Sequence, residues 1–153
     1  MKNTSWYPNP KEAENITIFI LWFSRYEFAL KNGNYQVIGK DNLEPDWGRF
    51  IADLNTQEVP IPNSLENELA YLKNNPPKKQ LSDKSWKAIQ RNSDWEWIIR
   101  SLTTVRNNLF HGGKHFDGQI LDPARDQVLI DICLKIMKEL ILFCPQEIQD
   151  FLS

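Results

Sequence analysis

Hydrophobic residues recur three or four positions apart in three long stretches of the chain, at residues 10–33, 93–111 and 122–144. This spacing places apolar side chains on one face of an α-helix. Each stretch opens on a capping signal: Asn-Pro for the first, Ser-Asp-Trp-Glu for the second and Asp-Pro for the third. Gly33 ends the first stretch, Gly112 follows the second and Pro145 follows the third, as is usual at helix ends. The pattern predicts three long amphipathic helices.

Shorter segments complete the predicted architecture. Residues Asp46–Leu54 and Asn63–Leu72 have the pattern of short helices, and the latter opens with an Asn-x-x-Glu capping signal. Only Tyr35–Ile38 is β-prone, and we expect residues 147–152 to be a frayed end. The sequence therefore predicts an all-α fold, a helical bundle of three to four long helices plus short helices.

The composition fits one domain spanning residues 1–153. Hydrophobic side chains make up 41% of the chain and the formal net charge is -2, which argues against coating nucleic acid by bulk charge. The longest apolar run, Ile18–Phe23, has six residues, far below the ~20 that cross a bilayer. The first residues carry no secretory signal pattern. We expect a cytoplasmic protein with no membrane partner.

The two cysteines are expected to be free. Cys133 and Cys144 both fall in the third predicted helix, where their separation of 11 residues corresponds to ~16 Å. A disulfide requires a Cα separation of about 5 to 7 Å. Buried thiols in a reducing compartment are the expected state.

The first predicted helix is apolar over more than one face. Ile18, Leu21, Trp22 and Phe28 lie off its main stripe. A single small bundle does not bury a second stripe, so we expect these residues to pack against another copy of the chain. The sequence predicts a homodimer.

Imidazole chemistry is confined to one segment, because His111 and His115 are the only histidines. Their spacing suits a helical metal pair, but Gly112 and Gly113 are expected to end the helix between them. No third histidine or cysteine is near in the sequence. We therefore expect no metal and no other cofactor.

Arg106, Asn107 and His111 are the polar residues from which a site could form. Asn107 and His111 share a helix face, while Arg106 is turned by about 140° from His111. The negative end of the helix dipole favours a protonated imidazole in the last turn, and this form can donate a proton. The alternative is structural: an Arg and a His near a helix end can serve only to cap carbonyl groups.

The string Arg106-Asn107-Asn108-Leu109-Phe110-His111 resembles the R-N-x3-H signature of the HEPN superfamily (higher eukaryotes and prokaryotes nucleotide-binding). Residues Phe23–Leu30 also resemble the first core helix of many prokaryotic members. The resemblance implies an all-α, often dimeric, metal-independent endoribonuclease of a toxin-antitoxin, phage-defence or RNA-processing system. It makes Arg106 and His111 the catalytic pair and Asn107 a polar helper. One subset of the superfamily carries a tyrosine two residues after the histidine, where Gly113 stands here.

RNA is the partner that the resemblance implies, and an antitoxin protein is a second one. Residues 78–91 hold five basic residues and one acidic residue, a net charge of +4. Such a segment could follow a phosphate backbone, although a solvated surface is the usual meaning of a basic run. The residues expected to bind RNA are Lys84, Lys87, Arg91 and Lys114.

The sequence offers no evident attacking group of its own, because no activated Ser or Cys, carboxylate pair or metal cluster accompanies His111. The ribose 2'-hydroxyl of RNA would then be the nucleophile. The alternative is a catalytically inactive HEPN module that binds RNA or protein as a dimer.

Overall fold

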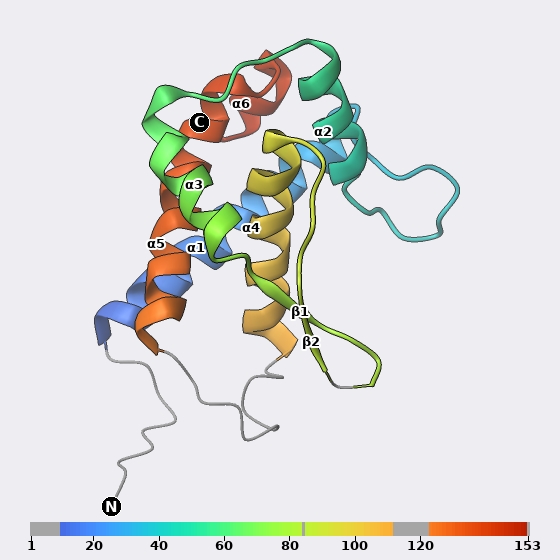
Figure 1. The fold of residues 1–153 in the computed structure, drawn as a ribbon. Coiled ribbons are helices and arrows are strands. Elements are labelled where there is room, and N and C mark those ends of the chain that lie inside the picture. The colour runs from blue at the N-terminus through green and yellow to red at the C-terminus, as the bar shows by residue number, and fades with distance from the viewer. Residues whose placement is uncertain (1–9, 84, 112–122, 153) are drawn as a thin grey trace, which may run out of the picture.

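The computed structural model describes residues 10–83, 85–111 and 123–152, and these residues form a helical bundle (Figure 1). In chain order the elements are α1 (Pro10–Asn32), α2 (Trp47–Thr56), the 3-10 turn η1 (Asn63–Leu65), α3 (Glu66–Asn74), β1 (Lys78–Gln80), β2 (Trp86–Ala88), α4 (Asp94–His111), α5 (Pro123–Leu140), the 3-10 turn η3 (Ile141–Phe143) and α6 (Gln146–Leu152). The three long helices are α1, α4 and α5. The predictions of a mainly helical fold and of these three helices are confirmed.

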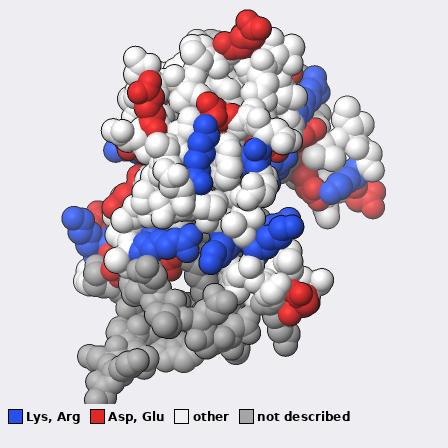
Figure 2. All heavy atoms as spheres, viewed as in Figure 1, with Lys and Arg blue, Asp and Glu red and all other residues white. Residues whose placement is uncertain are grey.

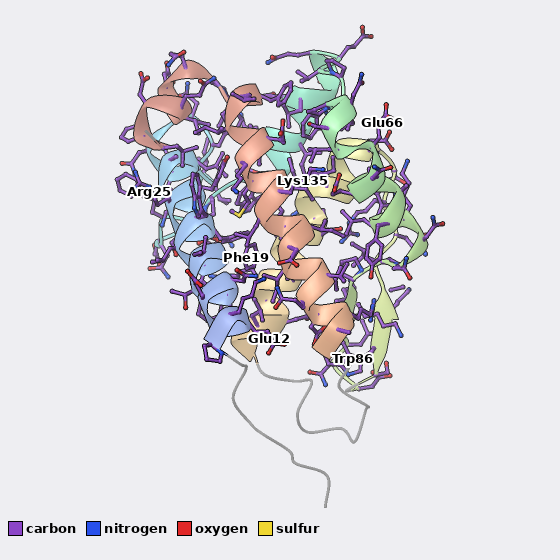
Figure 3. The ribbon with its side chains drawn as sticks, turned by 90° about the vertical axis from the view of Figure 1, so that its left-hand side faces the viewer. Glu12, Phe19, Arg25, Glu66, Trp86 and Lys135 are labelled. Atoms are coloured by element: carbon purple, nitrogen blue, oxygen red, sulfur yellow. The ribbon has the colours of Figure 1, made fainter. Side chains whose placement is uncertain are left out.

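The core lies where the long helices meet. Helix α1 packs on α5 and α6, while α4 packs on α2, α3 and α5. Figure 3 shows Phe19 on the side of α1 that faces α5, and its side chain is fully buried. The Tyr26 hydroxyl donates a 2.6 Å hydrogen bond to the Met137 carbonyl oxygen, so a buried polar contact also joins α1 to α5. Burial raises the pKa of Tyr26 well above its ordinary value.

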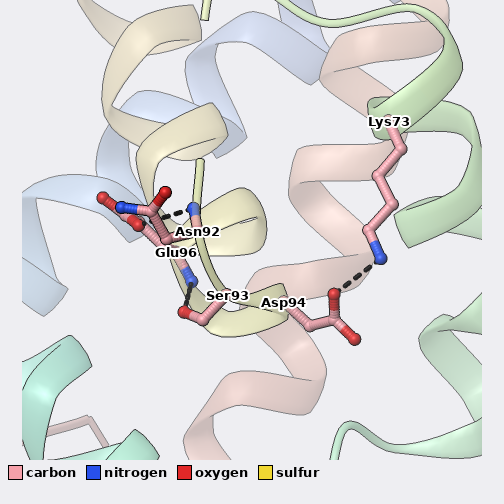
Figure 4. A network of polar contacts seen from close by, with 5 residues as sticks. All are labelled: Lys73, Asn92, Ser93, Asp94 and Glu96. Carbon is pink, nitrogen blue, oxygen red and sulfur yellow. Dashed lines mark hydrogen bonds and ion pairs between the residues drawn. The ribbon is translucent and has the colours of Figure 1, made fainter. Parts of the chain in front are cut away.

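The start of α4 forms a variant of the predicted capping box, in which the Glu96 carboxylate accepts from the residue before the N-cap Ser93 (Figure 4). Ser93 Oγ accepts a 3.1 Å hydrogen bond from the backbone N–H of Glu96, and the Glu96 carboxylate accepts one from the backbone N–H of Asn92 at 3.0 Å. Two N–H groups at the helix start are thereby satisfied. Nearby, Lys73 of α3 pairs with Asp94 at 2.6 Å. These contacts fix the start of α4, the motif helix, which carries Arg106, Asn107 and His111.

Two other short elements were predicted with different success. The short helix predicted over Asp46–Leu54 is α2, and Asp46 caps it by accepting a 2.9 Å hydrogen bond from the Arg49 N–H. The helix predicted over Asn63–Leu72 is present as η1 and α3, but its capping box is not, because Asn63 opens a 3-10 turn and α3 begins at Glu66 without a side-chain cap. The β-prone segment contributes only an isolated bridge between Gln36 and Pro45.

Two further predictions from the sequence are corrected. Lys78–Gln80 and Trp86–Ala88 pair as the antiparallel strands of a hairpin, β1–β2, where only a basic run was recognised. The expected frayed end is helix α6, because Ile148 and Leu152 are buried against the core. Their burial supplies the stabilisation that the seven-residue segment lacks on its own.

The two cysteines are free and buried, as expected, but they do not share a helix. Cys133 lies in α5, whereas Cys144 follows the 3-10 turn η3. Burial raises the pKa of both thiols, that of Cys144 to about 12. Among the described residues, none of the helices combines the length and the apolar character needed to cross a bilayer.

Candidate functional site

Arg106 occupies the contact between α4 and α1. Its Nη2 lies 3.8 Å from Oε2 of Glu27, and both side chains are partly exposed, at 31% and 23%. The guanidinium carbon lies 5.6 Å from the centroid of the Phe23 ring and 4.8 Å from that of Phe110. Two rings and one carboxylate therefore hold the arginine. Its partial exposure leaves the charged group within reach of a ligand.

Asn107 is exposed and contacts Arg106 directly. The Asn107 Oδ1 accepts a 3.0 Å hydrogen bond from Nη1 of Arg106. Glu27 and Asn107 thus contact different nitrogens of one guanidinium and restrict its orientation. Arg106 and Asn107, which the resemblance placed in one candidate site, are therefore in direct contact.

Glu27 was not recognised as a site residue from the sequence. It lies within Phe23–Leu30, a segment singled out for its resemblance to a first core helix, but that resemblance did not point to Glu27 itself. Its partner Arg106 is distant in the chain, and no local pattern joins the two residues. Only the tertiary fold, which places Glu27 of α1 near Arg106 of α4, brings them together.

His111 is the last residue of α4. Its backbone position is one turn beyond Asn107 on the same helix face, and about 7.5 Å along the axis from Arg106. The side chain of His111 lies outside the described part of the chain, as do His115 and Lys114.

The hairpin lies on the other side of the motif helix. The Asn108 amide Nδ2 donates a 2.8 Å hydrogen bond to the carbonyl oxygen of Lys78 in β1. Successive helix residues are turned by about 100°, so Arg106 and Asn108 lie on opposite sides of Asn107. The exposed Asn107 face of α4 is therefore flanked by α1 and by β1.

The predicted RNA-binding residues have different environments. Lys87 is exposed in β2, directly opposite Lys79 of β1. Arg91 is half-buried and donates to the adjacent Gln90 carbonyl at 2.7 Å. Desolvation, with a contribution from Arg100, lowers the pKa of Arg91. Lys84 is outside the described residues.

Basic side chains gather on one face of the molecule. Figure 2 shows Lys and Arg in a band across the view of Figure 1, at the level of the hairpin. Since the whole chain has a formal charge of -2, this band is a local departure from the average. Such a surface attracts anionic ligands.

Within the described residues, no group of three or more His, Cys, Asp or Glu side chains is placed to hold a metal ion. This finding does not extend to His111 and His115, whose side chains lie outside that part of the chain. The two buried cysteines have raised pKa values, so neither is an activated nucleophile near neutral pH.

Comparison with known proteins gives no relative. No family model matches the sequence, and no curated protein or solved structure matches it either. The function of the protein is therefore inferred from its residues and their arrangement.

Proposed function

We propose that this protein is a metal-independent endoribonuclease with a HEPN-like fold, acting in the cytoplasm in a toxin-antitoxin or phage-defence context. The observation that carries the proposal is the arrangement at the end of α4. There, an R-N-x3-H string holds an oriented, partly exposed arginine beside an exposed asparagine. The string's histidine follows on the asparagine's helix face.

Arg106 would stabilise the charge that develops on the phosphate. A guanidinium can donate two parallel hydrogen bonds to phosphate oxygens. In the free protein its carboxylate neighbour Glu27 is at 3.8 Å, a weak contact that a phosphate group can replace. Asn107 would keep the guanidinium oriented as this exchange takes place.

His111 would transfer protons. The ribose 2'-oxygen loses its proton to the imidazole and forms a bond to phosphorus, while the bond between phosphorus and the 5'-oxygen breaks. The His111 imidazolium formed in this step, the form that the helix dipole favours, gives the proton to the departing 5'-oxygen and returns to its neutral state. The products are a 2',3'-cyclic phosphate and a 5'-hydroxyl. No metal ion or other cofactor enters this scheme.

Exposed apolar residues support a homodimer. Leu21 and Phe28 of α1 are 61% and 52% exposed, and Phe110 of α4 is 58% exposed. Phe110 also contacts Arg106, so a dimer that covers Phe110 would bring the two motif helices together. Each chain would then contribute Arg106 and His111 to one composite site.

A binding module without catalysis is the second candidate. The contacts of Arg106 with Phe23, Phe110 and Glu27 are ones that a purely structural arginine also makes. In that case the basic band would bind RNA, or an antitoxin protein, without cutting.

Incubation of the pure protein with RNA, with and without EDTA, tests the proposal. The wild-type protein should cut in both conditions, and His111→Ala should not cut although it binds RNA normally. Binding of RNA without cleavage by the wild-type dimer would favour the second candidate. Cleavage that EDTA abolishes would exclude the proposed chemistry.

A further inference from the structure

The β1–β2 hairpin presents two lysines side by side on one face. Lys79 and Lys87 are direct cross-strand partners. Side chains alternate along a strand, so this pair lies on the face opposite to Trp86 and Ala88. Trp86 and Ala88 are half-buried, whereas both lysines are exposed. The lysine pair therefore faces solvent.

This pairing is unfavourable in the free protein. Opposed side chains of an antiparallel pair have Cβ atoms ~5 Å apart, and like charges at this position destabilise the sheet. Neither lysine has an ion-pair partner among the described residues. The nearest acidic residue in the hairpin sequence, Asp83, accepts instead from the Ser85 N–H and hydroxyl, at 2.9 and 2.6 Å. An anionic ligand would remove the repulsion.

The hairpin is attached to the motif helix by a defined contact. Asn108 donates to the Lys78 carbonyl at 2.8 Å, and Lys78 is the residue before Lys79. Asparagine is a poor helix former, so helix stability does not explain its presence within α4. Its amide instead fixes the position of β1 relative to Arg106, two residues earlier in α4.

We propose that Lys79 and Lys87 bind the phosphate backbone of an unpaired RNA strand. In this proposal Asn108 is the positioning residue that holds the lysine pair close to Arg106. The choice of RNA rests on the proposed function. An unpaired strand is required because in-line attack by a 2'-hydroxyl needs a backbone free to leave A-form geometry. Neutralisation of phosphates by the two lysines would release counterions and make binding dependent on salt.

Equilibrium binding of a fully 2'-O-methylated RNA oligonucleotide tests the inference, because this probe cannot be cut through the 2'-oxygen. The double variant Lys79→Gln/Lys87→Gln should reduce the slope of log K against log salt by about 1.4, ~0.7 for each lost phosphate contact. The matched control is Lys40→Gln/Lys138→Gln, which also removes two positive charges, from exposed positions outside the hairpin. The control should leave the slope unchanged. Equal slopes for the double variant and the control would overturn the proposal that the lysine pair binds phosphate.

Asn108→Leu keeps every charge and most of the side-chain volume but removes the donor. Binding should weaken about 2- to 10-fold, the equivalent of one neutral hydrogen bond, while the salt slope stays near that of the wild type. Asn32→Leu is the control, since the Asn32 amide also donates to a carbonyl oxygen, that of Phe28, at 2.8 Å. Wild-type affinity in Asn108→Leu would overturn the positioning role.

Two outcomes separate this inference from the proposed function. If binding depends on the lysine pair but unmodified RNA stays intact, RNA binding by the pair is supported and the nuclease proposal fails. If RNA is cut but binding does not depend on the pair, the nuclease proposal is supported and RNA binding by the lysine pair is rejected. A poly-glutamate peptide that competes as well as RNA, and does so only with the lysine pair present, would show a surface for an acidic protein and overturn the choice of RNA.

Discussion

Arg106 of α4 and Glu27 of α1 form an ion pair with a nitrogen-to-oxygen distance of 3.8 Å. The distance is close to the limit for such contacts, and both groups are partly exposed. A pair of this kind contributes between about 0 and 1 kcal/mol to stability. It orients the guanidinium without binding it so strongly that a phosphate could not compete.

The first prediction concerns this pair. Glu27→Ala and Arg106→Ala, combined in a double-mutant cycle, should give a coupling free energy below about 1 kcal/mol by urea denaturation. Arg106→Ala alone should cost about 1 to 2 kcal/mol, because it also removes contacts with the Phe23 and Phe110 rings. A coupling above about 2 kcal/mol would identify the pair as structural.

Catalysis should depend on the shape of the guanidinium as well as on its charge. Arg106→Lys keeps the positive charge but loses the planar pair of donors. We expect RNA binding close to wild type and cleavage reduced by at least about tenfold, since two phosphate oxygens can no longer be held at once. Equal loss of binding and of cleavage would indicate that Arg106 only binds the substrate.

The capping box should stabilise α4 by a measurable amount. Ser93→Ala removes the acceptor for the Glu96 N–H and also for the Asn55 amide at 3.1 Å, so the free energy of unfolding should fall by about 1 kcal/mol. Ser93→Thr retains the hydroxyl and should recover most of the loss. Thermal unfolding followed by circular dichroism measures both. Ser64, exposed in η1, provides the control for a serine outside a cap.

Helix α6 should be part of the cooperative unit. Ile148 is 1% exposed and its Cγ1 lies against Gly33 at the end of α1. Ile148→Ala should therefore cost about 2 to 5 kcal/mol. Leu142→Ala, at a position that is 67% exposed, should have almost no effect. Similar losses for the two variants would indicate that α6 does not pack as described.

The thiols give a prediction about pH. Both cysteines have raised pKa values in the folded protein, about 12 for Cys144, because burial disfavours the thiolate. Their contribution to stability is complete below the unfolded value near ~8.5 and is lost as pH rises from there towards the folded values. At pH 8 neither thiol should react with an alkylating reagent until urea unfolds the chain. Rapid labelling of the native protein would show that a cysteine is accessible.

The elements that the sequence predicted correctly have local signals. Ser93 and Glu96 lie within one helical turn of each other, and Asp46 caps α2 by the same local rule. The hairpin had no such signal, because Lys79 and Lys87 are neither apolar nor β-prone and their relation exists only through strand register. Helix α6 was missed because it forms through burial against distant residues.

The same distinction between local signals and contacts made by the fold applies to the candidate site. The pairing of Arg106 with Asn107 follows from adjacency in the chain. The ion pair of Glu27 with Arg106 depends on how α1 packs in the fold. The hydrogen bond of Asn108 to Lys78 depends on where the hairpin lies. Neither contact is encoded in a short motif, so the sequence alone could not supply them.

The central claim is that the substrate provides the nucleophile for cleavage by Arg106 and His111. The most direct measurement uses an RNA with one strong cleavage site and a matched RNA carrying a single 2'-deoxy nucleotide immediately 5' of the scissile phosphate. In the presence of EDTA, the wild-type protein should cut the first RNA to a 2',3'-cyclic phosphate and a 5'-hydroxyl, and should leave the same bond intact in the second. Cleavage of the substituted bond would contradict the account, because the attacking oxygen would then have to come from another source.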